Sequence, residues 1–336
     1  MKKLLMNLQL FADMNTNTTL SPDLSVENKT FYDMTLIDEA GPELVHDQFA
    51  QKRPIPKNGG KTIEFRKFCS LEKATKPLTE GVTPDGNTLK AEKIEATVEQ
   101  FGDYIVQSDM LDLTAIDNTI VEATKVLGRQ AGVTLDTITR NVLQSGKNVF
   151  YAPKADGTEV TSRTNLDKTC LLTPALIKRA ANFLKRNNAP KIDGSYVAII
   201  HPDVALDLQN NDEWIEAHKY AAPENIYEGE LGKIGGIRFI ESSEAKVYTT
   251  DAQGNPLAEG IAVYGCLFMG AGAYGTTEIT GGGLETIIKQ LGAGEDPLNQ
   301  RSSIGWKATK TAEILSEPYL LRLECVSSVC DTAIEN

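Results

Sequence analysis

Residues 61–66 read KTIEFR and residues 93–99 read KIEATVE, two stretches in which apolar and polar side chains alternate. Alternation with a period of two is typical of a β-strand with one apolar face, so the pattern predicts a hairpin within residues 61–107. An isolated hairpin is marginal in water, and exposed strand edges pair readily with other chains. We therefore expect a neighbouring subunit to cover the apolar face, although a hairpin packed on its own domain is the alternative. The face consists of Ile63, Phe65, Ile94 and Val98.

A long amphipathic helix is predicted directly after the hairpin. From about Thr114 to Ser145 apolar residues recur at steps of three or four, which marks one face of a helix. Gly146 follows as a candidate C-cap. At ~1.5 Å per residue the helix would be roughly 45 Å long, several times the usual length. Such a helix can form the spine of a flat domain.

Composition limits the classes of function. The chain has 336 residues, enough for a substantial core and about two domains, and it carries a formal net charge of −12. This charge argues against a protein that reads nucleic-acid sequence, because such proteins carry a basic stripe. The cysteines are odd in number and scattered, which favours reduced thiols that fill the core over a disulfide scaffold. They are Cys69, Cys170, Cys266, Cys325 and Cys330.

The N-terminus resembles a signal peptide only superficially. Its apolar stretch is short, is interrupted by polar residues and lacks a small-x-small cleavage pattern. Leu4, Leu8 and Phe11 fall on one face of a helix, so we expect an arm that docks on a partner. Residues 13–30 are polar and have the composition of a tether. No stretch of the sequence is apolar enough to span a membrane.

A mixed α/β lobe is predicted over about residues 172–250. Thr173 supplies an N-cap oxygen for an amphipathic helix, and Tyr196–Ile200 has the composition of a buried strand. His201 begins a turn that opens a second helix. From Ile261 onward, strand-like runs separated by glycines predict a β region that packs under the long helix.

The sequence offers no convincing catalytic, cofactor or metal site. The spacing G-x-G-x-x-G at residues 270–275 follows a predicted strand, but no helix follows it, so turns between strands are expected. Residues 60–62 (GKT) resemble the end of a P-loop, yet a strand follows there too. The histidines stand in no metal-binding or catalytic pattern. They are His46, His201 and His218.

Four stretches, in their order along the chain, carry a resemblance to a known family. They are MNLQLFA at 6–12, a strand with a His-Pro-Asp turn at 196–203, IYEGELGKIGGIRF at 226–239, and DPLNQR leading to GWK at 296–307. Together with the order of arm, hairpin, long helix, lobe and returning strands, they resemble the tailed-phage major capsid protein of the Hong Kong 97 type across nearly the whole chain. More narrowly, the chain resembles the branch related to the coliphage N-four capsid protein.

The resemblance implies an α+β fold in five parts. These are an N-terminal arm (1–60), a hairpin called the E-loop in that family (61–107), a peripheral domain with the spine helix (108–171), an axial domain (172–250) and a closing peripheral sheet (251–336). The family's lysine–asparagine cross-link is not carried over, because no motif here matches its lysine, asparagine or activating acid.

The resemblance also implies a structural protein rather than an enzyme. Copies would assemble through hexamers and pentamers into the icosahedral head of a tailed phage, each E-loop lying over the adjacent subunit, around double-stranded DNA that is not recognised by sequence. Implied partners are a separate scaffolding protein, a portal and head accessory proteins, with assembly in the cytoplasm of the host bacterium. Alternatives are an encapsulin-like compartment shell and a metabolic α/β enzyme.

Overall fold

The computed structural model describes Leu36, Ala40 and most of the chain from Leu44 to Asn336. The residues outside the description between 44 and 336 are 55–60, 69–70, 72, 76, 78–79, 82, 84–85, 115–118, 212–213, 215–231, 252, 279–283, 291–297 and 334. The predicted arm residues Leu4, Leu8 and Phe11 therefore lie outside the described residues.

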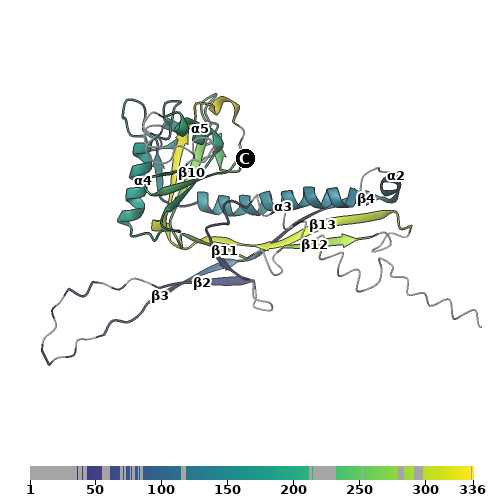
Figure 1. Cartoon of the computed structure of the whole chain (residues 1–336), viewed down its shortest axis with the longest axis horizontal. Helices are drawn as coiled ribbons and strands as arrows, with labels where there is room; N and C mark the ends of the chain where they lie inside the picture. Colours follow the sequence, from purple (N-terminus) through teal and green to yellow (C-terminus); the bar gives the residue numbers. More distant parts are fainter. Residues whose placement is uncertain are drawn as a thin grey trace, which may run out of the picture.

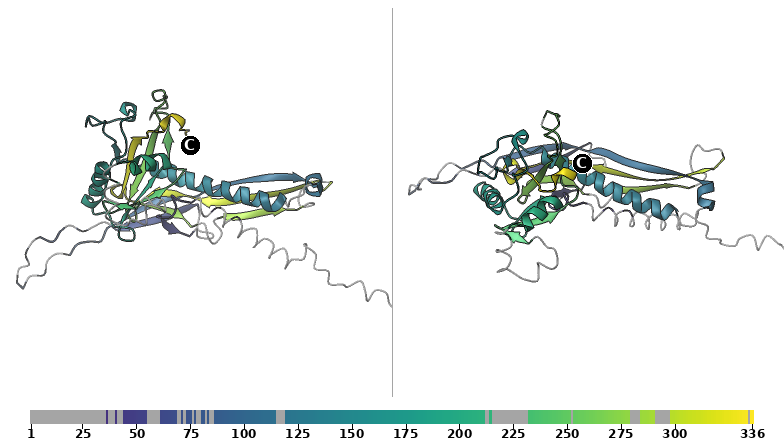
Figure 2. Two further views of the ribbon diagram at one scale, coloured as in Figure 1. Left: turned by 45° about the horizontal axis from the view of Figure 1, so that its top comes forward. Right: turned by 90° about the horizontal axis from the view of Figure 1, so that it is seen from above.

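The subunit is elongated (Figure 1). Helix α3 (Thr119–Gln144) lies along a narrow sheet, and a lobe of helices and strands stands at the C-terminal end of the helix. The two further views in Figure 2 show the helix on one side of the narrow sheet, which gives this half the form of a plate. We call α3 together with its sheet the plate.

The plate is built by one helix stripe on one sheet. Strands β4 (Glu99–Ser108), β13 (Arg301–Lys310) and β12 (Leu284–Lys289) form an antiparallel sheet in the order β12-β13-β4. The apolar stripe of α3 is buried on this sheet, because the repeat of 3.6 residues keeps its members on one side. The contact consists of Leu127, Ala131 and Leu135 with Leu284, Ile304, Trp306 and Ala308, and with Leu36 and Ala40.

The predicted long helix is confirmed over most of its length. The predicted start at Thr114 differs from the structure, where a separate short helix α2 (Asp109–Thr114) precedes α3. Residues 115–118, which include the predicted stripe residue Ile116, lie outside the description. Ser108 caps α2 by accepting a hydrogen bond from the backbone N of Leu111 at 3.3 Å, so the chain turns at this point.

The lobe is built around one mixed sheet of seven strands, in the order β5-β15-β10-β6-β8-β7 with β9 paired to β10. Its predicted helices and strands are confirmed, including the N-cap, since the side chain of Thr173 accepts a hydrogen bond from the backbone N of Leu176. The strands are β5 (Val149–Tyr151), β15 (Leu320–Val326), β10 (Val263–Met269), β6 (Tyr196–Ile200), β8 (Ile237–Glu241), β7 (Lys233–Ile234) and β9 (Val247–Tyr248). The helical segments are α4 (Pro174–Arg186), α5 (Pro202–Gln209) and the 3-10 turns η3 (Arg163–Asn165), η4 (Glu317–Tyr319) and η5 (Cys330–Thr332).

The closing strands differ from the expectation that they all pack under the long helix. Strands β12 and β13 do so, whereas β10 and β15 lie in the centre of the lobe sheet, beside β6. Every residue of β10 is buried, which is what a strand covered on both faces requires. The chain therefore returns to the lobe twice after residue 250 instead of closing only the plate.

A third sheet joins the lobe to the plate. Strand β1 (Gln51–Arg53) pairs in parallel with β11 (Tyr274–Thr277), and β11 pairs antiparallel with β14 (Ala312–Ile314). The G-x-G-x-x-G spacing at 270–275 forms the turn between β10 and β11 together with the start of β11, as the sequence predicted.

The predicted hairpin forms, but its apolar face is covered within the chain. Strands β2 (Thr62–Phe68) and β3 (Ala91–Thr97) pair antiparallel. Ile63 and Phe65 are buried, and a Cβ on Gly275 of β11 would overlap the Phe65 ring. The expectation that a neighbouring subunit covers these two residues is therefore corrected, because the glycine in β11 leaves room for the ring. The cluster consists of Ile63, Phe65 and Ala96, with Ile94, Val98 and Leu315 packed around it.

The joint between α3 and the lobe combines the buried apolar contact of Leu143 with several polar contacts. The side-chain amide of Gln144 donates to the carbonyl O of Gly265 at 2.8 Å and accepts from the hydroxyl of Tyr248 at 3.2 Å. One turn earlier, Arg140 donates to the carbonyl O of Glu244 at 2.7 Å. Because hydrogen bonds depend on direction, these contacts fix the angle at which the helix meets the lobe.

Candidate assembly surfaces

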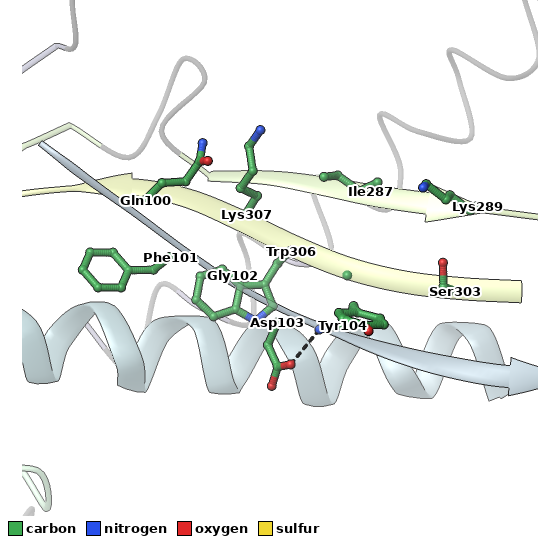
Figure 3. A pocket seen from close by; sticks show the side chains of 11 residues that line it. Gln100, Phe101, Gly102, Asp103, Tyr104, Ile287, Lys289, Ser303, Trp306 and Lys307 are labelled. Atoms are coloured by element: carbon green, nitrogen blue, oxygen red, sulfur yellow. Dashed lines mark hydrogen bonds between the residues drawn. The ribbon is translucent and has the colours of Figure 1, made fainter. Parts of the chain in front are cut away.

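The face of the plate that points away from α3 carries exposed apolar side chains. Register places Tyr104 of β4, Gly305 of β13 and Ile287 of β12 in one row across the sheet. Tyr104 is 68% exposed and Ile287 is 39% exposed, so the row is open to solvent. A shallow groove of about 630 Å³ runs over it (Figure 3). Its lining residues are Gln100, Phe101, Gly102, Asp103, Tyr104, Ile287, Lys289, Ser303, Gly305, Trp306 and Lys307.

Because Gly305 has no side chain, the surface is recessed at the centre of this row. A Cβ at Gly305 would lie 2.7 Å from the Cβ of Tyr104 and 2.9 Å from the carbonyl O of Asp103. Any larger residue would push β13 away from β4. The glycine therefore keeps the two strands close and leaves a hollow between two apolar side chains, into which a side chain of another molecule can insert.

Charged side chains around the groove point to opposite sides of the sheet (Figure 3). In Figure 3 Lys307 points away from α3, whereas Asp103 points toward it. Gln130 of α3 donates to the Asp103 carboxylate at 2.7 Å and accepts from the Trp306 indole nitrogen at 3.2 Å. The hydrogen bond from Gln130, followed by one from the backbone N–H of Tyr104, lowers the pKa of Asp103. The carboxylate thus helps to hold β4 on the helix.

The end of the plate farthest from the lobe is also apolar. Met110 and Leu111 of α2 are exposed, as are Val106 near the end of β4 and Leu298 in the turn before β13. The backbone N of Asp109 donates to the carbonyl O of Gln300 at 3.0 Å, which holds the two segments together. Large exposed apolar patches are characteristic of protein contact surfaces.

The hairpin presents charged residues on its other face. Lys93 lies 2.5 Å from the Glu64 carboxylate and 2.6 Å from that of Glu95. The hydrogen bond with Lys93 lowers the pKa of Glu64. Beyond the paired strands, every described residue from Leu71 to Lys90 is exposed. The described residues of this extension are therefore accessible to another molecule.

The structure separates the residues that the sequence suggested for contact. Ile63 and Phe65 are buried within the chain, whereas Ile94 and Val98 are half-buried beside them. The contact of Ile94 and Val98 with a neighbouring subunit stays a prediction.

The exposed row of Tyr104, Gly305 and Ile287 on the plate is not predicted from the sequence. Its sequence signal is that β4 is apolar on both faces, because Phe101 and Ile105 alternate with Tyr104 and Val106. A strand that covers a helix with one face needs no apolar residues on the other.

The histidines that the structure describes serve local structure. His201 caps α5 by accepting from the backbone N of Asp203 at 3.2 Å, and burial lowers its pKa. His46 binds Asp136 through both its backbone N and its ring. No group of three His, Cys, Asp or Glu side chains suited to a metal ion occurs among the described residues.

The described cysteines and helices add two findings. Four cysteines are free and buried, as predicted, while Cys69 lies outside the description. None of the described helices has both the length and the apolar composition needed to cross a bilayer. The four cysteines are Cys170, Cys266, Cys325 and Cys330.

Comparisons with known proteins point in one direction. A family model described as "Phage capsid protein" matches residues 8–290. Among solved structures, the capsid of cyanophage Pam1 is similar with a TM-score of 0.61 at 14% identity, covering 86% of this chain and 92% of the other. The capsid of cyanophage P-SCSP1u has a TM-score of 0.59 at 17% identity, with 82% and 86% covered. The mature capsid of bacteriophage PhiM1 has a TM-score of 0.56 at 17% identity, with 83% and 86% covered.

These likenesses differ in weight. The structural matches are far below 25% identity, so they show a shared fold alone. No curated protein sequence matches the chain. The family model is stronger evidence of what the chain is, because it spans most of the 336 residues.

Proposed function

Because this chain belongs to the phage capsid protein family, it is a structural protein of a phage head and not an enzyme, and we propose how its surfaces bring copies together. The fold is the α+β fold of Hong Kong 97-like capsid proteins, as the resemblance implied. The narrower coliphage N-four branch stays a prediction.

Self-assembly uses the hairpin extension of one copy and the plate of the next. The observation that carries this proposal is the row of Tyr104, Gly305 and Ile287, an apolar hollow exposed on the open face of a sheet. The extension from Leu71 to Lys90 is exposed over all its described residues and carries Leu71 and Leu89 as exposed apolar side chains. An extended segment with apolar residues fits a sheet face that offers an apolar hollow.

Rings of six and five copies then close into an icosahedral shell. Many weak contacts, each worth a few kcal/mol, make a closed assembly stable while single contacts stay reversible. The net charge of −12 favours a shell that encloses double-stranded DNA without binding it by sequence. In this proposal a scaffolding protein, a portal and head accessory proteins assist, and assembly takes place in the host bacterial cytoplasm.

Deleting residues 72–90 tests the hairpin. We expect a folded subunit that forms no closed particles in negative-stain electron microscopy, because the exposed extension is gone while β2 and β3 keep their pairing. Normal shells from this variant would refute the hairpin contact.

A point variant tests the plate. Tyr104→Asp places a charge in the apolar row and is expected to leave single subunits in sedimentation analysis. The matched control is Val126→Asp, because Val126 is 64% exposed but lies on α3 rather than on the open sheet face. If both variants lose assembly equally, or neither does, the row on the plate is not the contact.

A further inference from the structure

A cluster of charged side chains is buried where the segment before β1 meets the plate. Asp47 lies in that segment, Asp136 and Thr139 belong to α3, and Lys310 ends β13. All four side chains are shielded from solvent; Lys310 is 1% exposed and Asp47 is 3% exposed. Charged groups are rarely buried this fully, because removing an ion pair from water costs more than the attraction within the pair returns.

The cluster aligns one amine with one carboxylate. The Nζ of Lys310 contacts Oδ2 of Asp47. The other oxygen, Oδ1, accepts a hydrogen bond from the Thr139 hydroxyl at 2.6 Å. Neighbouring contacts hold the segment in place, since the backbone N of His46 donates to Asp136 at 2.7 Å and the Tyr274 hydroxyl donates to the carbonyl O of His46. Both oxygens of the Asp47 carboxylate are therefore engaged, one by the amine and one by the hydroxyl.

We propose that Lys310 and Asp47 join in an amide bond within the subunit, with the loss of one water molecule. The ammonium of Lys310 first gives a proton to the Asp47 carboxylate, which leaves an amine and a carboxylic acid. The amine nitrogen then attacks Cγ of Asp47, so that a C–N bond forms and a C–O bond breaks. The departing hydroxyl takes a proton from the nitrogen and leaves as water. No oxidant, cofactor or second protein is required.

Burial supplies the reactivity. The lack of solvent lowers the pKa of Lys310, which favours the neutral, nucleophilic amine. The Thr139 hydroxyl is placed to stabilise the negative charge that develops on Oδ1 during attack. The same dry surroundings hinder the reverse reaction, because hydrolysis needs water at Cγ.

Exposed ion pairs of the same type provide the contrast. Lys168 lies 2.5 Å from Asp331 and Lys93 lies 2.5 Å from Glu64, but in both pairs the lysine side chain is about half exposed. Solvent keeps both partners of such pairs ionised, and an ammonium is not a nucleophile. The proposal therefore applies to the buried pair and not to these two.

The bond would close a ring across 263 positions of the chain. It would tie the segment that leads into β1 to the end of β13, so that this segment could not leave the plate even if β1 lost its pairing with β11. Constraining so long a loop also lowers the entropy of the unfolded chain.

Mass spectrometry of the full-length purified subunit tests the bond directly. We expect an intact mass lower than the sequence mass by one water molecule. After tryptic digestion we expect residues 30–52 joined to residues 308–322, because trypsin does not cut after a modified Lys310. An intact mass equal to that of the sequence would overturn the proposal. So would a water loss that maps to an Asp-Gly pair such as Asp85-Gly86.

Two variants refine the result. Lys310→Arg keeps the charge but removes the primary amine, so the mass should equal that of its sequence and the joined peptide should vanish. Thr139→Val keeps the side-chain shape and removes the hydroxyl, so the bond should form roughly 100-fold more slowly in a time course after synthesis. Equal rates in Thr139→Val and the parent chain would remove Thr139 from the step. These readouts do not depend on shell formation, so they stand apart from the proposed assembly contacts.

Discussion

The variant Phe65→Ala distinguishes a hairpin that packs on its own subunit from one that packs on a neighbouring subunit. Phe65 is 1% exposed and packs on Gly275 of β11 within the same chain. Moving a phenylalanine side chain out of water is worth ~1.5–3 kcal/mol, and the cavity left by Phe65→Ala brings the expected loss to ~3–5 kcal/mol. A two-stranded hairpin is marginal without support, so this loss is enough to release the base of the hairpin from the body.

Hydrogen exchange in the unassembled subunit measures the effect. We expect the amides of β2 (Thr62–Phe68) and β3 (Ala91–Thr97) to lose protection in Phe65→Ala, while the lobe strands keep theirs. Leu89→Ala is the control, because Leu89 is 67% exposed and its truncation should change no protection.

The opposite outcome would refute the packing argument. If Phe65→Ala kept full protection in the single subunit and lost only assembly, the apolar face of the hairpin would belong to a neighbour, as the sequence first suggested. Equal loss of protection over the whole chain would also count against it, since it would mean that the hairpin is not a separate unit of stability.

Three further predictions concern the plate, the lobe and the charge. Gln130→Leu removes the partner of both Asp103 and Trp306, so thermal denaturation should show a loss of ~1–3 kcal/mol. Burial lowers the pKa of His201 below 6.5, so as the pH falls the unfolded chain protonates this imidazole before the folded chain does. The contribution of His201 to the free energy of unfolding should therefore be level above pH 6.5 and should fall as the pH drops below it. The variant His201→Asn should flatten this slope. Because the net charge is −12, a gel-shift assay at physiological salt should show only weak, salt-sensitive DNA binding by the subunit, and tight binding would contradict the proposed role.

Periodicity predicted the elements that pack by a regular stripe. The stripe of α3 and the buried run of β6 (Tyr196–Ile200) are set by local spacing, and both are found. The long helix is predicted to start at about Thr114, which in the structure is the last residue of the separate helix α2. Spacing alone cannot show where the axis of a helix changes direction.

Partners distant in sequence were harder to predict. The cover for Phe65 comes from Gly275, 210 positions later, and a glycine gives no apolar signal. Likewise β10 (Val263–Met269) was assigned to the plate, although its place in the lobe follows from pairing with β6 and β15. The row on the plate needed the register of β4, β12 and β13, which no single strand reveals.

The polar joint at Gln144 has a consequence for the geometry of a closed container. Oriented hydrogen bonds resist bending more than apolar contacts, which can slide, so the helix and the lobe behave as one stiff bracket. In our proposal the same bracket sits in rings of five and of six, whose surfaces slope differently. The contacts between subunits must then accommodate the difference in slope, above all where the long, exposed hairpin extension rests on the next copy.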